Sequence, residues 1–219
     1  MVRHDWGLLA QQRLRKKLES ISSADDYCVA RFRFLIQRLK PTDSLIEKTP
    51  TNIYHVPTIK RLFPDAKIIA IFRDGRDVVI SDMHHRLRAN GQNVSFQDRT
   101  RNWCQAMEAQ LLCENQYDLL SISYESLLSD PHNTLNKIMT HLELPHDASL
   151  QNDMIKRSSF EFVTDRKSGQ ENTTTFYRKG AKGDWINIFT EEETRTFSGL
   201  AGEVLVKLGY EQSADPVTW

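Results

Sequence analysis

The sequence predicts an α/β domain with a mainly parallel central sheet. Two short apolar runs, 67–72 and 119–123, have the length and composition of buried strands. Stretches with apolar residues at helical spacing flank these runs, and the alternation of strands with helices favours a parallel sheet. The chain has 219 residues, enough for one domain with a sizeable core, so we expect a single domain over 1–219.

The first part of the chain is predicted to be mostly helical. Residues 8–20 form a charged helical stretch, and 27–39 form a second helix that Pro41 ends. A short strand is expected at 44–46, followed by a helix at 53–63. This part therefore supplies at most one strand to the sheet.

The middle of the chain contains the clearest strand. Residues 67–72 have the sequence KIIAIF, and a continuous apolar run of this kind is typical of a parallel strand covered on both faces. A turn at 73–77 follows, with a helix from about Asp77 onward. Another helix is expected at 96–115, before the second buried strand at 119–123.

Proline, glycine and capping residues mark the elements of the last part. Pro131 occupies the first position of a helix, where no amide hydrogen is needed. Residues 163–184 are rich in Lys, Arg, Gly and Thr and are predicted to form a loop. Thr190 and Glu193 have the spacing of a capping box for the last helix, which is expected to end at Gly209.

The composition excludes several classes of protein. Lys plus Arg (29) balances Asp plus Glu (29), which argues against a general nucleic-acid binder. No apolar run approaches the length of a membrane span, and residues 1–6 have no signal-peptide pattern, so we expect no membrane partner. Three cysteines (Cys28, Cys104 and Cys113) without a CxxC or Cys/His cluster predict reduced thiols, no metal site and a cytoplasmic location.

The end of the strand at 67–72 is the first candidate site, because open α/β sheets bind ligands at the carboxyl ends of their strands. Arg73 lies at this end, and Ser81 lies eight residues further on, about two turns into the next helix. Together they could hold a phosphate by charge-assisted hydrogen bonds. An ion pair between Arg73 and Asp77 on the turn is an equally good interpretation of Arg73 taken alone.

Two further segments combine charge with turn residues. Residues 178–185 (RKGAKGDW) carry three cations and two glycines, which suits an anion-binding loop, although a solvated flexible loop is the alternative. At 46–50 (IEKTP), Glu47 and Lys48 point to opposite faces if the strand is regular, and a turn at 49–50 would let both approach one site. The alternative is a surface pair that adds little stability.

These segments together resemble the sulfotransferases that use 3′-phosphoadenosine 5′-phosphosulfate (PAPS). The frame IFRDGRDVVISDMHH, which holds Arg73 and Ser81, is similar to the family's 3′-phosphate-binding segment. The sequence FYRKGAKGDW at 176–185 is similar to its carboxy-terminal signature. Between them, Tyr124 is similar to the tyrosine that contacts adenine, and 158–160 resembles the stretch that also holds the base.

The resemblance, which extends from about residue 44 to 209, implies a fold and an activity. The fold is a three-layer α/β/α arrangement of the P-loop NTPase-like sulfotransferase type. The activity is transfer of a sulfonate from PAPS, without a metal, to a hydroxyl or amine of a glycan or small-molecule acceptor, leaving adenosine 3′,5′-bisphosphate (PAP). The implied nucleotide-binding residues are Arg73, Ser81, Tyr124, Ser158, Phe160, Arg178, Lys179 and Gly180. Lys48 would stabilise charge on the leaving phosphate.

The general base is open between two residues. Members that act on phenols and steroids have a histidine two places after the lysine, where this chain has Pro50. Carbohydrate-acting and bacterial members resemble this chain better, with a glutamate before the lysine, so Glu47 is the first choice and His55 the second. The family's dimer motif is not matched at 186–195, which leaves the oligomeric state open.

One family feature is not found in the amino-terminal part. The Gly-rich loop that holds the 5′-phosphosulfate has no counterpart in residues 1–47, which contain one glycine, Gly7. We therefore expect the first strand of the fold to be missing. The alternative function is a catalytically inactive fragment or degenerate member that only binds 3′-phosphoadenosine nucleotides. A nucleotide kinase of the related P-loop fold is disfavoured, since no Walker lysine loop is present.

Overall fold

A computed structural model describes most of the chain. The described residues are 44–219, except 89–93, 146, 171, 173–178 and 181. The chain divides into two compact units, 1–66 and 67–219. The helices expected at 8–20 and 27–39 lie outside the described residues, and the single-domain expectation stays a prediction.

The described part of the first unit is an irregular segment followed by two helical elements. Residues 44–49 have no regular structure, so the prediction of a strand at 44–46 is wrong. A strand needs a neighbour to accept and donate its backbone hydrogen bonds, and the described part of this unit offers none. The 3₁₀ helix η1 (Pro50–His55) and helix α3 (Val56–Leu62) cover the expected helical region and begin earlier than predicted.

The second unit contains a parallel pair of strands, as predicted. Strand β1 (Ile68–Phe72) pairs with β2 (Leu119–Ser123) so that Phe72 lies beside Ser123. Ile122 is 4% exposed, whereas Ile71 is 60% exposed. The expectation that the first strand is covered on both faces is therefore wrong at Ile71. Because successive side chains of a strand point to opposite faces, one face of β1 is open near its carboxyl end.

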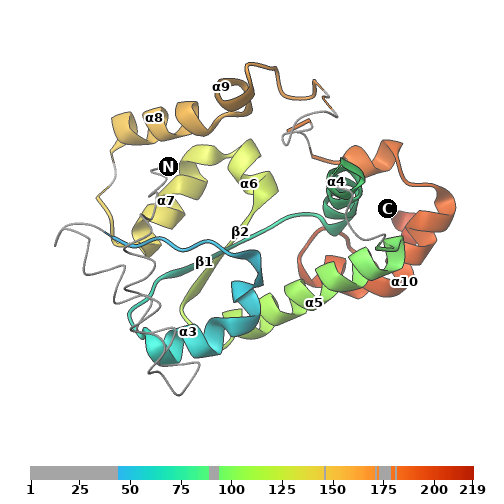
Figure 1. The fold of residues 1–219 in the computed structure, drawn as a ribbon, viewed down its shortest axis with the longest axis horizontal. Helices are drawn as coiled ribbons and strands as arrows, with labels where there is room; N and C mark the ends of the chain where they lie inside the picture. The colour runs from blue at the N-terminus through green and yellow to red at the C-terminus, as the bar shows by residue number, and fades with distance from the viewer. Residues whose placement is uncertain (1–43, 89–93, 146, 171, 173–178, 181) are drawn as a thin grey trace, which may run out of the picture. The chain divides into compact units, whose positions relative to one another are not determined.

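Helices α4 (Gly75–Arg88) and α5 (Phe96–Glu114) form the crossover between the two strands. Helices α6 (Tyr124–Ser129) and α7 (Pro131–His141) follow β2. In Figure 1, α6 and α7 lie on one side of the strands, and α5 lies on the other side. This arrangement agrees with the α/β fold expected from the alternation of strands and helices.

The last part of the chain is more helical than the sequence predicted. The elements are α8 (Ala148–Ser158), α9 (Phe160–Thr164), the 3₁₀ helix η2 (Asp184–Asn187), α10 (Glu191–Lys207) and the 3₁₀ helix η3 (Pro216–Thr218). The capping box of Thr190 and Glu193 is confirmed, and Gly209 follows α10 with φ at +77°. Helices α6, α8 and α9 were not predicted, although Ser123, Asp147 and Ser159 cap them.

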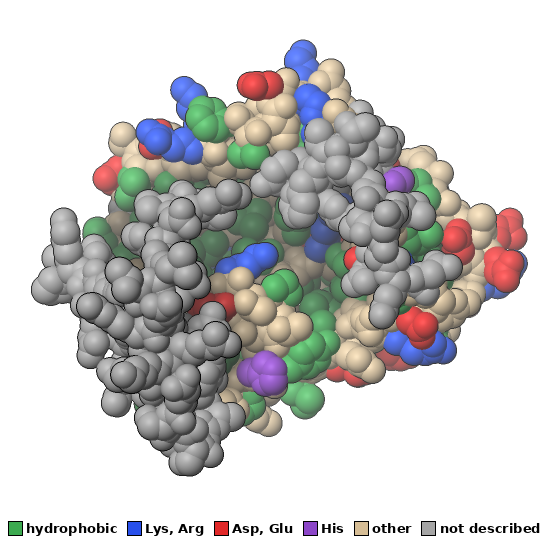
Figure 2. Space-filling model, viewed as in Figure 1, with side chains coloured by type: hydrophobic (Ala, Val, Ile, Leu, Met, Phe, Trp, Pro, Cys, Tyr) green, Lys and Arg blue, Asp and Glu red, His purple; other side chains and the backbone are tan. Residues whose placement is uncertain are grey.

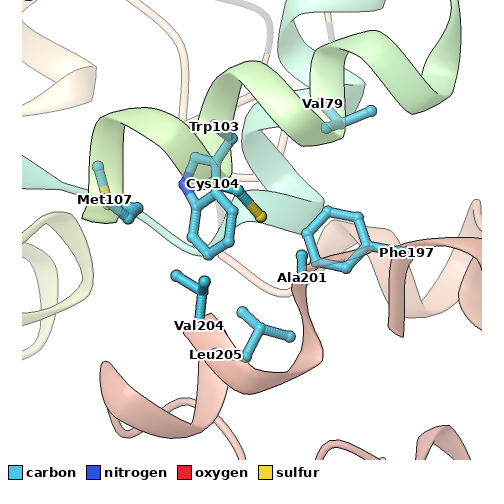
Figure 3. Close-up of a cluster of buried hydrophobic side chains, with 8 residues drawn as sticks. All are labelled: Val79, Trp103, Cys104, Met107, Phe197, Ala201, Val204 and Leu205. Carbon is cyan, nitrogen blue, oxygen red and sulfur yellow. The ribbon is translucent and has the colours of Figure 1, made fainter. Parts of the chain in front are cut away.

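The main core lies where α4, α5 and α10 meet (Figure 3). Its buried residues are Val79, Trp103, Cys104, Met107, Phe197, Ala201, Val204 and Leu205. The Trp103 indole also donates a hydrogen bond to the carbonyl oxygen of Arg73 at 3.1 Å. A Cβ atom on Gly75 would lie 2.4 Å from the same ring, so only glycine fits there. The core therefore holds the turn that follows β1.

The described cysteines are buried and free. Burial raises the pKa of the Cys104 thiol from 9.0 to about 11, with a smaller contribution from the charge of Glu108. Burial also raises the pKa of the Cys113 thiol. Cys28 lies outside the described residues, and the cytoplasmic location stays a prediction.

The surface of the described residues carries charges of both signs. Figure 2 shows basic and acidic side chains interspersed with hydrophobic ones on the face in view. Among the residues that the structure describes, no helix is long and apolar enough to cross a membrane. No group of three or more metal-ligating side chains occurs within the same residues.

Candidate functional site

Arg73 lies directly after β1, at the carboxyl end of the sheet. Because Phe72 and Ser123 are partners in the parallel pair, the residues that follow them, Arg73 and Tyr124, come side by side. The Cζ atom of Arg73 lies 4.9 Å from the centroid of the Tyr124 ring. The structure thus brings together two residues predicted to bind opposite ends of a nucleoside phosphate.

The Arg73 guanidinium also forms the ion pair that was the alternative interpretation of this turn. Its Nη2 atom lies 3.0 Å from Oδ2 of Asp77, in the first turn of α4. The Asp77 carboxylate is buried, and it also accepts hydrogen bonds from the amides of Gly183 (2.8 Å) and Trp185 (3.1 Å). One carboxylate therefore joins Arg73 to the end of the 178–185 loop.

Ser81 lies one helical turn after Asp77 in α4. Residues four apart share a helix face, so Ser81 continues the face that carries Asp77. Its side chain is partly buried. A hydroxyl in this place can donate to an anion, and the phosphate role of Ser81 stays a prediction.

The described end of the predicted loop is held by hydrogen bonds and packing. The Lys179 ammonium lies 2.5 Å from the Asp184 carboxylate, which is 5% exposed. The amide of Gly169 donates to the Lys179 carbonyl at 2.9 Å, and the Ser168 hydroxyl donates to the Gly180 carbonyl at 2.8 Å. A fully solvated flexible loop is therefore a poor description of residues 179–185 where the structure describes them.

Gly180 and Phe160 come from separate segments and contact each other. Gly180 has φ at +63°, and a Cβ atom there would lie 2.3 Å from the Phe160 ring. The Arg166 guanidinium lies 5.1 Å from the centroid of the same ring. Two of the predicted nucleotide-binding residues thus pack directly together, which glycine alone permits.

A second arginine fixes the turn that contains Trp185. Arg76 is buried, and its guanidinium carbon lies 3.8 Å from the Trp185 ring centroid and 5.0 Å from that of Trp219. It forms ion pairs with Asp74 at 2.7 Å and Glu211 at 2.5 Å. Packing on the rings and pairing with both carboxylates hold Trp185 against the start of α4.

Tyr210 is a further polar residue beside this site. Its hydroxyl donates to the Glu125 carboxylate at 2.7 Å, and the other oxygen of Glu125 accepts from the Asp74 amide at 3.1 Å. Burial raises the pKa of the Tyr210 phenol, and the hydrogen bond to Glu125 raises it further. Tyr210 therefore stays protonated near neutral pH and is a poor candidate for a general base.

The predicted catalytic residues belong to the first unit. The Glu47 carboxylate accepts hydrogen bonds from the Thr49 hydroxyl at 2.6 Å and from the Asn52 side-chain amide. These bonds tie Glu47 to the turn that begins η1. Lys48 and His55 are exposed. The roles of Glu47, Lys48 and His55 stay predictions.

Ser158 and Arg178 are the two remaining predicted nucleotide-binding residues. The hydroxyl of Ser158 donates to the Met154 carbonyl of its own helix at 2.8 Å, and its contact with a base stays a prediction. Arg178 lies outside the described residues.

Sequence reasoning missed the part played by three residues in this site. Asp77 was considered only as an ion-pair partner, and Asp184 and Trp185 only as the end of a basic loop. The four-residue spacing from Arg73 and the unusual Asp-Trp pair were the available signals. Neither could show that Asp77 and Asp184 are buried, or that the backbone amide of Trp185 donates to the Asp77 carboxylate.

Comparison with known proteins identifies the family. A family model described as the sulfotransferase family matches residues 6–148, more than half of the chain. The chain belongs to the sulfotransferase family. The match begins well before residue 44, where the sequence resemblance was placed, so that limit was too narrow.

Named relatives and solved structures are similar to this chain. A Caenorhabditis elegans protein provisionally named a protein-tyrosine sulfotransferase is 29% identical over 77% of this chain and 66% of its own length. Protein-tyrosine sulfotransferase 1 of Danio rerio is 24% identical over 83% of this chain and 52% of its own length. The chain thus spans less than two thirds of the length of these curated relatives.

The crystal structure of a mouse sulfotransferase in complex with PAP has the same fold. It matches with a TM-score of 0.58 and 21% identity, over 89% of this chain and 88% of that chain. This likeness supports the α/β sulfotransferase fold.

Proposed function

We propose that this protein transfers a sulfonate group from PAPS to a hydroxyl or amine of an acceptor. The observation that carries the proposal is the junction at Asp77. There, Arg73 of the 3′-phosphate-like segment and the turn at 183–185 of the carboxy-terminal signature are bound by one carboxylate. Two motifs far apart in the sequence therefore form one site at the carboxyl end of β1.

The chemistry of the proposed donor set suits a phosphate. Arg73 supplies a guanidinium, Ser81 a hydroxyl, Lys179 an ammonium and Gly180 a backbone amide, all of which donate hydrogen bonds. Asp77 and Asp184 balance the charges of Arg73 and Lys179, so affinity would depend on directed N–H and O–H donors more than on net charge. A guanidinium carries five N–H donors, so Arg73 can donate to a phosphate while it also donates to Asp77.

The chemical step would be assigned to the segment that contains Glu47 and Lys48. Sulfonate transfer, like phosphoryl transfer, needs in-line positioning and neutralisation of charge more than covalent help from the protein. We assign Glu47 as the general base for the acceptor, with His55 as the alternative, and Lys48 as the cation beside the leaving phosphate. PAPS, when bound, supplies the sulfonate and leaves as PAP.

The acceptor class is part of the proposal. We place a hydroxyl of a glycan or small molecule first, because Glu47 precedes Lys48 as in carbohydrate-acting members. A tyrosine side chain of a protein is the second class, favoured by the names of the similar nematode and zebrafish proteins.

The test is selective nucleotide binding. Calorimetry should show tighter binding of PAP than of 5′-AMP, and Arg73→Ala should cost about 1.5–3 kcal/mol of PAP binding, the usual worth of a charged hydrogen bond. Arg101→Ala is the matched control, since Arg101 is an exposed arginine of α5 that pairs with Asp98 at 3.0 Å. Equal affinities of the wild-type protein for PAP and 5′-AMP would refute the assignment.

Transfer of labelled sulfonate from PAPS to glycans, phenols and a tyrosine peptide would then identify the acceptor class. Selective PAP binding without transfer to any of the three would favour a protein that only binds the nucleotide.

A further inference from the structure

Asp77 is an acid at the centre of a site assigned to an anion. Its side chain is buried, and it accepts from one arginine and two backbone amides. Arg73 lies four residues before Asp77, and the amides of Gly183 and Trp185 lie 106 and 108 residues after it.

We propose that Asp77 is a positioning residue for the 3′-phosphate site. It holds the Arg73 guanidinium and the turn at 183–185 in one fixed arrangement. The phosphate binds only while the guanidinium and the turn keep that arrangement. The proposal rests on the proposed function, because it assumes that Arg73 binds the 3′-phosphate. It adds that the carboxylate is required even though its charge has the same sign as that of the ligand.

The competing account of Asp77 makes the opposite prediction. If Asp77 only balanced the charge of Arg73, its removal would leave the cation free to act on the ligand, and a phosphate would bind more tightly because a like charge is gone. If Asp77 positions the site, removal weakens binding in spite of the gain in positive charge. The sign of the effect therefore distinguishes the two accounts.

Asparagine is the informative replacement because it has nearly the same shape. Oδ2 of Asp77 accepts from Arg73 and Gly183, and Oδ1 accepts from Trp185. The single side-chain oxygen of asparagine can replace only one of these two oxygens, and its NH₂ group then faces the donors of the other. Asp77→Asn thus breaks at least one of the three bonds without emptying the site. Asp82→Asn is the matched control, since Asp82 lies in the same helix and pairs with an arginine of α5, Arg99.

The experiment measures the affinities of the full chain for PAP and for 5′-AMP. Asp77→Asn should weaken PAP binding about tenfold or more, the equivalent of one charged hydrogen bond, and leave 5′-AMP binding nearly unchanged. A variant that was merely less folded would lose both affinities in the same proportion. Asp82→Asn should keep the wild-type ratio of the two affinities.

Hydrogen exchange gives a readout that does not depend on the ligand. In Asp77→Asn, the amides of Gly183 and Trp185 should exchange faster, while the amides of α5 and α10 keep their protection. Asp77→Glu is the second variant: it keeps the buried charge, so Arg73 remains compensated, but moves the carboxylate by one methylene. Its ratio of PAP to 5′-AMP affinity should also fall.

The outcomes separate this proposal from the proposed function. Unchanged or tighter PAP binding by Asp77→Asn, or by Asp77→Glu where the first variant does not fold, overturns the positioning role and leaves the proposed function intact. Equal affinities for PAP and 5′-AMP in the wild type overturn the proposed function. Hydrogen exchange then still tests Asp77: if the amides of Gly183 and Trp185 exchange at the wild-type rate in Asp77→Asn, Asp77 does not position the turn.

Discussion

Replacing Gly180 by alanine should destabilise the protein through two separable effects. Gly180 has φ at +63°, where a side chain is strained, and the new Cβ would lie 2.3 Å from the Phe160 ring. The left-handed conformation costs roughly 1–2 kcal/mol for a residue with a Cβ. Overpacking against a ring typically costs about 1–3 kcal/mol. Phe160 is only partly buried and lies in the short helix α9, so we expect the lower half of that range.

Gly169 offers a matched control. It has φ at +88°, but a Cβ there would meet no atom within 4 Å. Gly169→Ala should therefore cost only the backbone strain, about 1 kcal/mol. We expect Gly180→Ala to lower the free energy of unfolding by about 1–2 kcal/mol more than Gly169→Ala does.

Urea denaturation of the four members of a Gly180/Phe160 mutant cycle measures this difference. In a Phe160→Ala background the ring is gone, so the cost of Gly180→Ala should fall to that of Gly169→Ala. If Gly180→Ala and Gly169→Ala cost the same, or if the full cost persists without the ring, the contact between Gly180 and Phe160 does not constrain the fold.

Two further predictions concern the core and the general base. Gly75→Ala should destabilise the protein by about 1–3 kcal/mol, because its Cβ would lie 2.4 Å from the Trp103 ring, whereas Gly199→Ala in α10, where a Cβ meets open space, should stabilise it by up to about 1 kcal/mol. Thermal unfolding of both variants would contradict this reasoning if the two shifts had the same sign. In a sulfonate-transfer assay, Glu47→Gln should lower turnover by about a hundredfold and leave PAP affinity nearly unchanged. A loss of turnover in His55→Ala but not in Glu47→Gln would assign the base to His55.

Local signals in the sequence predicted many elements of the fold. The parallel strands, the long helix at 96–115, the helix that begins at Pro131 and the capping box at Thr190 all depend on apolar patterns or on residues within one turn of each other. The short helices α8 and α9 were missed because their apolar periodicity is brief, although Asp147 and Ser159 supplied the capping signal. A capping residue without a long apolar pattern is a weak predictor of a helix.

The strand expected at 44–46 was wrong for a related reason. The apolar residues there are few, and strand formation depends on a neighbouring chain that a local pattern cannot reveal. The exposed side chain of Ile71 has the same explanation, since a run of apolar residues shows which strands can be buried but not which faces are covered.

The candidate site also combines features that the sequence predicts with contacts that only the tertiary structure reveals. From the sequence alone, Arg73 was predicted to lie at the carboxyl end of a strand, and residues 178–185 were predicted to be a basic loop with two glycines. Residue type and position relative to a strand are local properties, so a sequence can reveal them. Only the tertiary structure decided that Asp77 joins them and that Phe160 packs on Gly180. Both contacts connect segments that are distant in the chain. They exist because tertiary packing places the turn at 183–185 beside the start of α4, and Gly180 beside Phe160 of α9.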